Sequence, residues 1–216
     1  DHQHKLSAGL SVNYDKYDES LLPITLSPNS LIASQMELTP GVFAEYTYTY
    51  KDKLTLLAGI REDYSTRYGF FTTPRMNLRY TPFEWWTLRG SVGLGYRSPN
   101  AIADNAAYLA SNRIYFFGDG QLAQERSMNT GLSTVFYIPM GKRELQLSGE
   151  YYYTKFLDGV IADMDRSLQG ITLYNMHDVE GAKYFSHNWQ VEASMEILRG
   201  WTMTAAFRYT DVKQTT

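Results

Sequence analysis

Histidine and acidic side chains are the groups in this chain that could bind a metal or transfer protons. His2 and His4 form a His-x-His pair at the start of the sequence, a spacing that can hold a transition metal. A native site needs three or four placed ligands, and this pair lacks them. His177, followed by Asp178, and His187 lie in or beside an expected loop, where contact with solvent is the simpler role. We therefore predict no metal site and no cofactor.

Catalytic motifs are also missing from the sequence. It contains no Gly-x-Ser-x-Gly, no His-Glu-x-x-His and no glycine-rich phosphate loop. There is no cysteine, which removes disulfides and thiol chemistry, and the net charge of -3 gives no reason to expect nucleic acid as a partner. We predict that the protein is not an enzyme and has no catalytic residues.

The remaining polar residues are spaced two apart, opposite apolar ones. In the stretch 73–98, Trp86 and Leu88 alternate with Thr87 and Arg89, and the pattern continues for more than ten residues. A period of two is that of a β-strand, whose successive side chains point to opposite faces. Strands in soluble sheets are mostly about five or six residues long, whereas transmembrane barrel strands are about 9 to 11 residues long. The pattern therefore favours a barrel wall with an apolar face toward lipid and a polar face toward a lumen.

Composition agrees with this interpretation. The 216 residues are 44% hydrophobic and 15% aromatic, with 18 tyrosines, which are common in strands and at membrane interfaces. The mean hydropathy of -0.37 is low for a membrane protein but does not exclude the bilayer, because half of each barrel strand faces water or the lumen. No apolar run approaches the roughly 20 residues of a spanning helix. No signal-peptide pattern is present, so we expect any export signal to lie upstream.

Nine such runs follow one another, which predicts an all-β, antiparallel up-and-down transmembrane barrel segment of about nine long strands. The runs cover residues 5–17, 41–50, 54–65, 74–80, 86–98, 126–138, 144–163, 187–198 and 201–209.

The connections alternate between long and short, as in barrels with long extracellular loops and short periplasmic turns. We predict the loops near 18–40, 66–73, 99–125 and 164–186, and the turns near Lys51, Thr81, Pro139 and Arg199. Trp85, Trp86 and Trp201 then lie at the periplasmic rim, where an aromatic girdle is expected. The alternative interpretation is that Trp85 and Trp86 are ordinary aromatics beside a hairpin turn.

Several segments resemble the barrel of TonB-dependent outer-membrane receptors, particularly the Bacteroidetes type. The most specific are Pro-Arg-x-Asn-Leu-Arg-Tyr at 74–80 and the Gly-x-Gly-x-Arg-x-Pro strand end at 93–99. The resemblance spans essentially the whole chain, and it also includes residues 40–48, 59–64, 124–132 and 206–213.

This resemblance implies a 22-stranded barrel in the bacterial outer membrane, filled by a plug domain. Such receptors import a scarce nutrient (an iron chelate, cobalamin, haem or an oligosaccharide) with energy from the TonB complex, which binds the N-terminal region. No plug-like region, TonB-contacting segment or closing aromatic strand end is found here. We therefore expect residues 1–216 to be a partial barrel domain whose partners are outer-membrane lipid, the plug of the same protein, the TonB complex and the ligand.

Two groups of residues are candidates for the site. Aromatic side chains in the loop 99–125 are candidates for ligand contact, with packing of the loop as the alternative role: Tyr115, Phe116 and Phe117. Arginines on the polar faces are candidates for contact with the plug, with cross-strand ion pairs inside the wall or direct ligand contact as alternatives: Arg61, Arg79, Arg89, Arg97 and Arg208.

Two other classes of protein stay open at this point. A soluble all-β carbohydrate-binding module would fit the abundant aromatics, but it would need shorter strands and leaves the alternation of connections unexplained. An outer-membrane β-barrel enzyme would need a catalytic set, and none is found. A lone wall segment would also expose two unpaired strand edges and an apolar face, so we expect it to be poorly soluble or to self-associate unless it curls into a smaller closed sheet.

Overall fold

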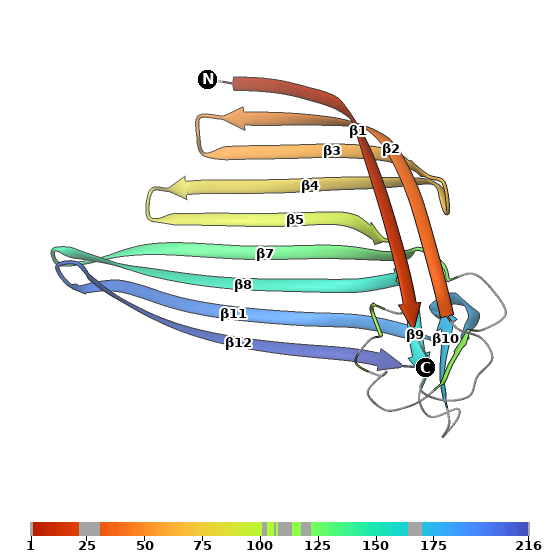
Figure 1. Ribbon diagram of the computed structural model, residues 1–216. Coiled ribbons are helices and arrows are strands. Elements are labelled where there is room, and N and C mark those ends of the chain that lie inside the picture. Colours follow the sequence, from red (N-terminus) through yellow and green to blue (C-terminus); the bar gives the residue numbers. More distant parts are fainter. Residues whose placement is uncertain are drawn as a thin grey trace.

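Nine long strands form one curved antiparallel sheet in the computed structural model (Figure 1). Their order is β1-β2-β3-β4-β5-β7-β8-β11-β12, so each strand pairs with its neighbours along the sequence. The structure describes residues 2–21, 31–100, 103–105, 107, 114–117, 122–163 and 170–215, with 19–21, 31–33 and 114–117 described by backbone alone. The strands are β1 His2–Leu21, β2 Leu31–Tyr50, β3 Leu54–Ser65, β4 Gly69–Phe83, β5 Trp86–Arg97, β7 Glu125–Met140, β8 Arg143–Asp158, β11 Lys183–Leu198 and β12 Trp201–Thr215.

The nine strands and their up-and-down order confirm the fold predicted from the period of two. Their ends differ from the prediction, most of all in β1 and β2, which are 20 residues each. The connection expected near 18–40 shrinks to 22–30, because the two strands stay paired out to Leu21 and Leu31. In β1, Lys16 and Asp18 replace the apolar residues of the stripe, so the alternation stops there, but the backbone groups still pair.

The other three expected loops also contain more regular structure than predicted. Only residues 66–68 connect β3 to β4, so most of the expected loop 66–73 belongs to β4. The segments 99–125 and 164–186 supply parts of a second, three-stranded sheet, β6-β10-β9, and a short 3-10 helix. These elements are β6 Ile114–Phe117, β9 Val160–Asp163, β10 Gly170–Asn175 and η1 Met176–Asp178. The predicted run 144–163 was wrong in its extent, because β8 ends at Asp158 and residues 160–163 form β9 in the small sheet. The strands β6 and β10 were not predicted.

The two ends of the large sheet differ, as the connection lengths predicted. At one end, which we call the turn end, strands are joined by two or three residues. Lys51 and Asp52 there have positive φ angles, as do Gly141 and Gly200, which is typical of tight hairpin turns. At the other end, the loop end, lie the longer connections and the small sheet (Figure 1). Ile171 and Leu173 of β10 are fully buried there.

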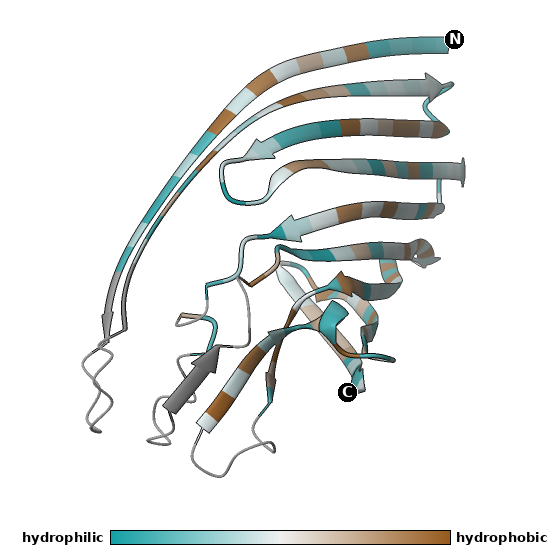
Figure 2. Cartoon of the chain, turned by 90° about the vertical axis from the view of Figure 1, so that its right-hand side faces the viewer, coloured by the Kyte–Doolittle hydropathy of each residue, from teal (hydrophilic) through white to brown (hydrophobic). Residues whose placement is uncertain are grey.

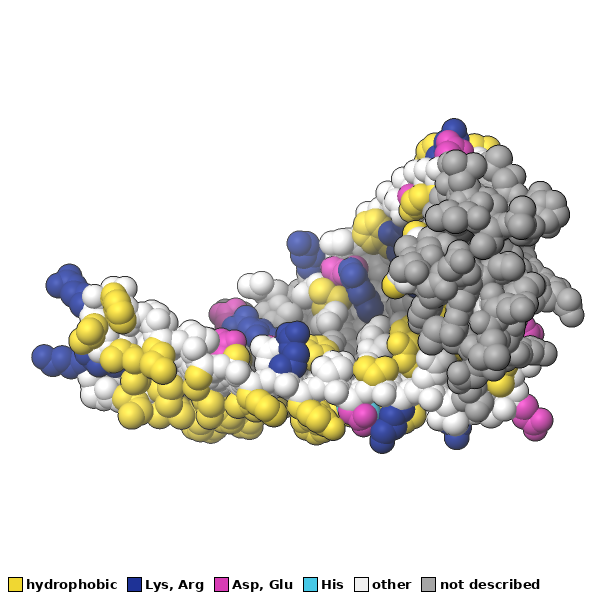
Figure 3. Space-filling model, turned by 60° about the horizontal axis from the view of Figure 1, so that its bottom comes forward, with side chains coloured by type: hydrophobic (Ala, Val, Ile, Leu, Met, Phe, Trp, Pro, Cys, Tyr) yellow, Lys and Arg dark blue, Asp and Glu magenta, His cyan; other side chains and the backbone are white. Residues whose placement is uncertain are grey.

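The two faces of the large sheet differ in chemistry. Apolar side chains are exposed along one face, and Figure 3 shows them as a continuous stripe on the convex side, with charged side chains gathered in the hollow above. Figure 2 shows the alternation along each strand that produces these two faces. We call them the convex face and the concave face. Large convex-face side chains that are mostly exposed include Leu6, Leu10, Ile60, Leu132, Val191, Met203 and Phe207.

Aromatic side chains form a band at each end of the convex face. At the turn end, Phe83 stacks on Trp85, and Trp86 lies parallel to Phe136 with ring centroids 6.0 Å apart. Trp201 is 74% exposed at the same end. The three tryptophans therefore lie at the turn end of the sheet, and the periplasmic rim assigned to them stays a prediction. A second band, at the loop end, was not predicted, and it contains Tyr64, Phe70, Tyr151, Tyr153 and Trp189.

One row of paired residues links the two bands across the sheet. It begins at His4 near the turn end of β1 and reaches Trp189 near the loop end of β11 without a register shift. Barrel strands tilt by ~35–45° and lie ~4.8 Å apart, so a row climbs about 3 Å per strand. Over this many strands it climbs roughly 20 Å, close to the ~25 Å height of a lipid-facing apolar band. The sheet therefore has the stagger of a tilted barrel wall.

Candidate functional site on the concave face

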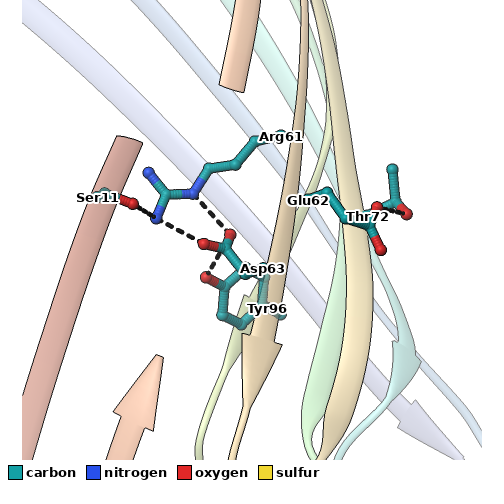
Figure 4. Close-up of polar contacts among 6 residues, drawn as sticks. All are labelled: Ser11, Arg61, Glu62, Asp63, Thr72 and Tyr96. Atoms are coloured by element: carbon teal, nitrogen blue, oxygen red, sulfur yellow. Dashed lines mark hydrogen bonds and ion pairs between the residues drawn. The ribbon is translucent and has the colours of Figure 1, made fainter. Parts of the chain in front are cut away.

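A buried carboxylate lies on the concave face near the loop end of β3 (Figure 4). Arg61 of β3 donates to both oxygens of Asp63, at 2.6 Å from Nε and 2.7 Å from Nη2, and its Nη2 also donates to Ser11 Oγ of β1 at 2.7 Å. The Tyr96 hydroxyl donates to Asp63 Oδ2 at 3.1 Å. Asp63 is only 1% exposed. A bidentate arginine and a phenol therefore satisfy the buried charge.

The position of Tyr96 corrects one detail of the strand pattern. Alternation along β5 places Tyr96 with Leu94 on the apolar face, yet its hydroxyl contacts Asp63 of the polar face. The pairing of β4 with β5 stops at Gly93, although β5 stays paired with β7 out to Arg97, so this end of β5 is held on one side only. On the other side of β3, Glu62 accepts a hydrogen bond from Thr72, as Figure 4 shows.

Two glycines make room for charged side chains to cross a neighbouring strand. A Cβ on Gly41 would lie 1.8 Å from Asp63 Oδ1, so the Asp63 carboxylate occupies the space above Gly41 on its way toward β1. Gly59 lies between Glu45 of β2 and Arg75 of β4, and the Arg75 guanidinium reaches across it to Glu45 at 2.5 Å. These are wall ion pairs of the kind expected as an alternative, but the Glu45 partner, Arg75, was not predicted.

The five predicted arginines do not behave alike. Arg61 is paired as above, Arg97 bonds to Asp104 and Glu125, and Arg208 donates twice to Gln190 Oε1 at 3.0 and 2.7 Å. Arg79 and Arg89 lie directly opposite each other on β4 and β5. Neither makes a hydrogen bond or ion pair within the described ranges. Like charges in this position destabilise a sheet unless an anion lies between or above them.

Polar groups at the loop end form a second cluster, which sequence reasoning missed. Glu37, 6% exposed, accepts hydrogen bonds from Ser65 Oγ at 2.6 Å and Ser98 Oγ at 3.0 Å. Arg67 lies over the Tyr68 ring, and burial raises the pKa of the Tyr68 phenol, an effect that the Arg67 charge opposes. Three buried donors there have no partner among the described residues, namely Arg67 Nη1, Tyr68 Oη and Gln124 Nε2.

An open pocket of about 550 Å³ lies at the loop end, between the large sheet and the small one. Its lining combines Arg97, Glu125 and Arg126 with the rings of Tyr96, Phe156 and Tyr184. The last two are stacked with centroids 4.2 Å apart.

The predicted aromatic residues 115–117 belong to β6, which pairs in parallel with β10 of the small sheet. This pairing places their backbone at the loop end. Their side chains lie outside the described residues, so their contact with ligand stays a prediction.

The two histidines of the His-x-His pair contact tyrosines. His2 Nδ1 lies 2.7 Å from Tyr48 Oη and His4 Nδ1 lies 2.6 Å from Tyr46 Oη, in the turn-end aromatic band. Among the residues that the structure describes, no three metal-ligating side chains come together. His177 lies 3.0 Å from Asp158 Oδ2.

The class of protein follows from these two faces, which define the wall of a transmembrane β-barrel with an apolar outside and a charged inside. The family model described as "TonB dependent receptor-like, beta-barrel" matches residues 1–216. The chain therefore belongs to the TonB-dependent receptor β-barrel family and is an outer-membrane protein. Within the described ranges, no helix has the length and apolar character needed to cross a membrane.

Similar proteins come from several bacteria. The chain is 23% identical over 188 residues to a probable TonB-dependent siderophore receptor, PirA, of Acinetobacter baumannii, which covers 81% of this chain and 24% of the relative. The FrpB iron transporter of Neisseria meningitidis matches with a TM-score of 0.67 and 18% identity, covering 98% of this chain and 33% of that one. A ferric enterobactin receptor (PfeA) mutant of Pseudomonas aeruginosa matches with a TM-score of 0.70 and 16% identity, covering 97% and 33%.

The chain thus spans about a quarter of the curated relative and a third of these solved structures. These relatives are receptors and transporters rather than enzymes. They include no protein of the Bacteroidetes, so that subtype stays a prediction.

Proposed function

We propose that this chain is part of the wall of a receptor that imports a ferric siderophore across the outer membrane with energy from the TonB complex. The proposal is supported by the names of the similar proteins, which are siderophore, iron and ferric enterobactin receptors or transporters. The other ligands expected from the family resemblance are cobalamin, haem and oligosaccharides, and no observation on this chain favours one of them.

The loop end is the extracellular side in this proposal, and the turn end is the periplasmic side. Barrels of the outer membrane have short periplasmic turns and longer extracellular loops, and the large sheet has this asymmetry. The loop-end pocket and residues 115–117 then face the medium from which the ligand arrives. The lining of the loop-end pocket combines guanidinium groups with aromatic rings, which suits a ligand that carries both negative charge and aromatic surface.

The observation that supports contact between this wall and a plug domain is the pair of adjacent arginines, Arg79 and Arg89, which have no partner among the described residues. Within the wall, the other arginines proposed for plug contact have acidic or amide partners, whereas these two face the hollow as bare, adjacent charges. A plug inside the barrel would supply the missing anion as an acidic side chain. Arg61, Arg97 and Arg208 would contact the plug with the N–H groups that their wall partners leave free.

Uptake measurements test this function. Cells that lack the full-length receptor should fail to grow on a ferric siderophore under iron limitation, and the wild-type gene should restore growth and uptake of radioactive iron. Alanine at Tyr115, Phe116 and Phe117 together should lower ligand affinity at least tenfold, whereas Trp201→Ala at the turn end should leave it unchanged. Unchanged uptake in the triple variant would contradict the proposal that these three rings contact the ligand. Growth on the ferric siderophore without the receptor would contradict the proposed substrate.

A second measurement addresses the plug. Hydrogen exchange of the full-length receptor should be faster in plug peptides of an Arg79→Ala and Arg89→Ala double variant than in wild type. Arg143→Ala, at the turn end of β8, is the matched control and should show wild-type exchange. Identical exchange in the double variant would mean that these arginines do not hold the plug.

A further inference from the structure

Along the convex face of β8, β11 and β12, the rows of side chains change from apolar to aromatic and then to positively charged toward the loop end. Val191 pairs with Phe207 in an apolar row, and two residues further on Trp189 lies between Tyr151 and Tyr209 in an aromatic row. The next row is Tyr153, His187 and Asp211. The row after that contains Lys155, Phe185 and Lys213, and Lys183 follows on β11.

Ring contacts hold these rows on one face. His187 Nδ1 lies 2.8 Å from Tyr151 Oη, and its ring centroid is 4.9 Å from that of Tyr153 and 5.5 Å from that of Phe185. Tyr151 and Trp189 are in contact at 4.2 Å between centroids. The aromatic band is thus continuous from Trp189 up to Phe185, and the lysines are placed at its outer edge.

Three lysines surround Phe185 with little acid to balance them. Lys155 and Lys213 lie directly opposite Phe185 on its two neighbouring strands, so their Cα atoms are roughly 10 Å apart, at ~4.8 Å per strand. Lys213 lies 3.4 Å from Asp211, while Lys155 and Lys183 make no ion pair in the part of the chain that the structure describes. Lys16, on the convex face of β1, differs because its own Asp18 lies at 2.8 Å.

The depth of this group matches the headgroup layer. Four residues separate Trp189 from Phe185 along β11, which is about 13 Å of strand, or roughly 10 Å of height at the usual tilt. Polar headgroups extend roughly 5–8 Å beyond the hydrocarbon on each side, and lysine stems lie along apolar surface while their ammonium groups reach polar surroundings. Figure 3 shows charged side chains where the apolar stripe ends toward the loops.

We propose that Lys155, Lys183 and Lys213 form a binding site for the phosphate groups of a phosphorylated glycolipid in the outer leaflet, whose acyl chains lie on the aromatic and apolar rows below. The choice of a lipid rests on the continuity of the site with the lipid-facing surface and on the excess of positive charge. The choice of leaflet rests on the orientation in the proposed function.

Lipid retention tests the site in the full-length receptor. Receptor purified from outer membranes in mild detergent should retain lipid A, and a variant with Lys155→Gln, Lys183→Gln and Lys213→Gln should retain at least fivefold less, measured by mass spectrometry. The matched control carries Lys51→Gln, Lys53→Gln and Lys142→Gln at the turn end and should retain the wild-type amount. Heat-modifiable gel mobility and siderophore uptake report folding and the import function separately.

The outcomes separate the sources of phosphate. Inorganic phosphate at 10 mM should displace little bound lipid A, because the acyl chains contribute to binding; complete displacement would point to a simple anion site and overturn the proposal. Equal lipid A retention in the triple variant and the control would overturn it too. A selective loss of phosphatidylglycerol instead of lipid A would place the group in the inner leaflet and contradict the orientation.

Discussion

Single residues on the concave face decide whether charged side chains can cross between strands. Gly41 is the clearest case, because Asp63 occupies the space that a side chain at position 41 would need. We expect Gly41→Ala to displace Asp63 and to cost about 1–3 kcal/mol of unfolding free energy, as overpacking does. Gly90 has no atom near its would-be Cβ, so Gly90→Ala should change stability by less than about 0.5 kcal/mol. Urea unfolding of the full-length receptor in detergent measures both, and equal effects would refute the crossing argument.

The Arg61–Asp63 pair gives a prediction of its own. Asp63→Ala would remove the buried acceptor of Arg61 and Tyr96 and should cost about 2–3 kcal/mol, less than for a fully buried pair because the Arg61 side chain is 31% exposed. The matched control is Asp18→Ala, which removes the exposed partner of Lys16 and should not change the unfolding midpoint. A shift in the control as large as that of Asp63→Ala would mean that burial is not the cause.

Strands are the scale at which the lipid-facing stripe acts. An arginine on the lipid face costs roughly 2–4 kcal/mol at mid-depth and roughly 0–1 kcal/mol near an interface. Leu132, 53% exposed, lies in the middle of β7, and Ile138 lies near its turn end on the same face. We expect Leu132→Arg to destabilise the receptor in lipid vesicles strongly and Ile138→Arg only slightly. Equal costs at the two depths would argue against a bilayer around this face.

The elements also show what a sequence can and cannot predict. A period of two, which lasts seven residues in the shortest run (74–80) and longer in the others, predicted all nine long strands and their order, because alternate side chains of a strand lie on opposite faces. It missed the extension of β1 and β2 to Leu21 and Leu31, and it missed the short strands β6 and β10.

Partners across the sheet were harder to predict than the strands. The contact of Arg75 with Glu45 depends on register and on Gly59 between them, which no local pattern encodes. The polar faces themselves were predicted, so the five arginines were placed on the correct side while the acids that bind them mostly were not.

Residues 1–216 form a wall with two open edges. Strands β1 and β12 each pair on one side only within the described residues, and the convex face exposes a broad apolar surface. Residues 1–216 expressed alone should therefore self-associate in detergent-free buffer, through edge pairing and apolar contact. Light scattering checks this, and a stable monomer would contradict the open-wall description. Detergent micelles should reduce the association by covering the apolar face.

Spin labels along β7 test the central claim, that the convex face meets lipid and the concave face meets the lumen. Residues 1–216 contain no cysteine, so single cysteines can be placed at each position from 127 to 138 of a full-length receptor in which any cysteine outside this segment is replaced by serine, and labelled in bilayers. Accessibility to oxygen, which concentrates in lipid, should be high at even positions such as Leu132 and low at odd ones such as Ser133. Uniformly low oxygen accessibility, or a profile without a period of two, would contradict the account.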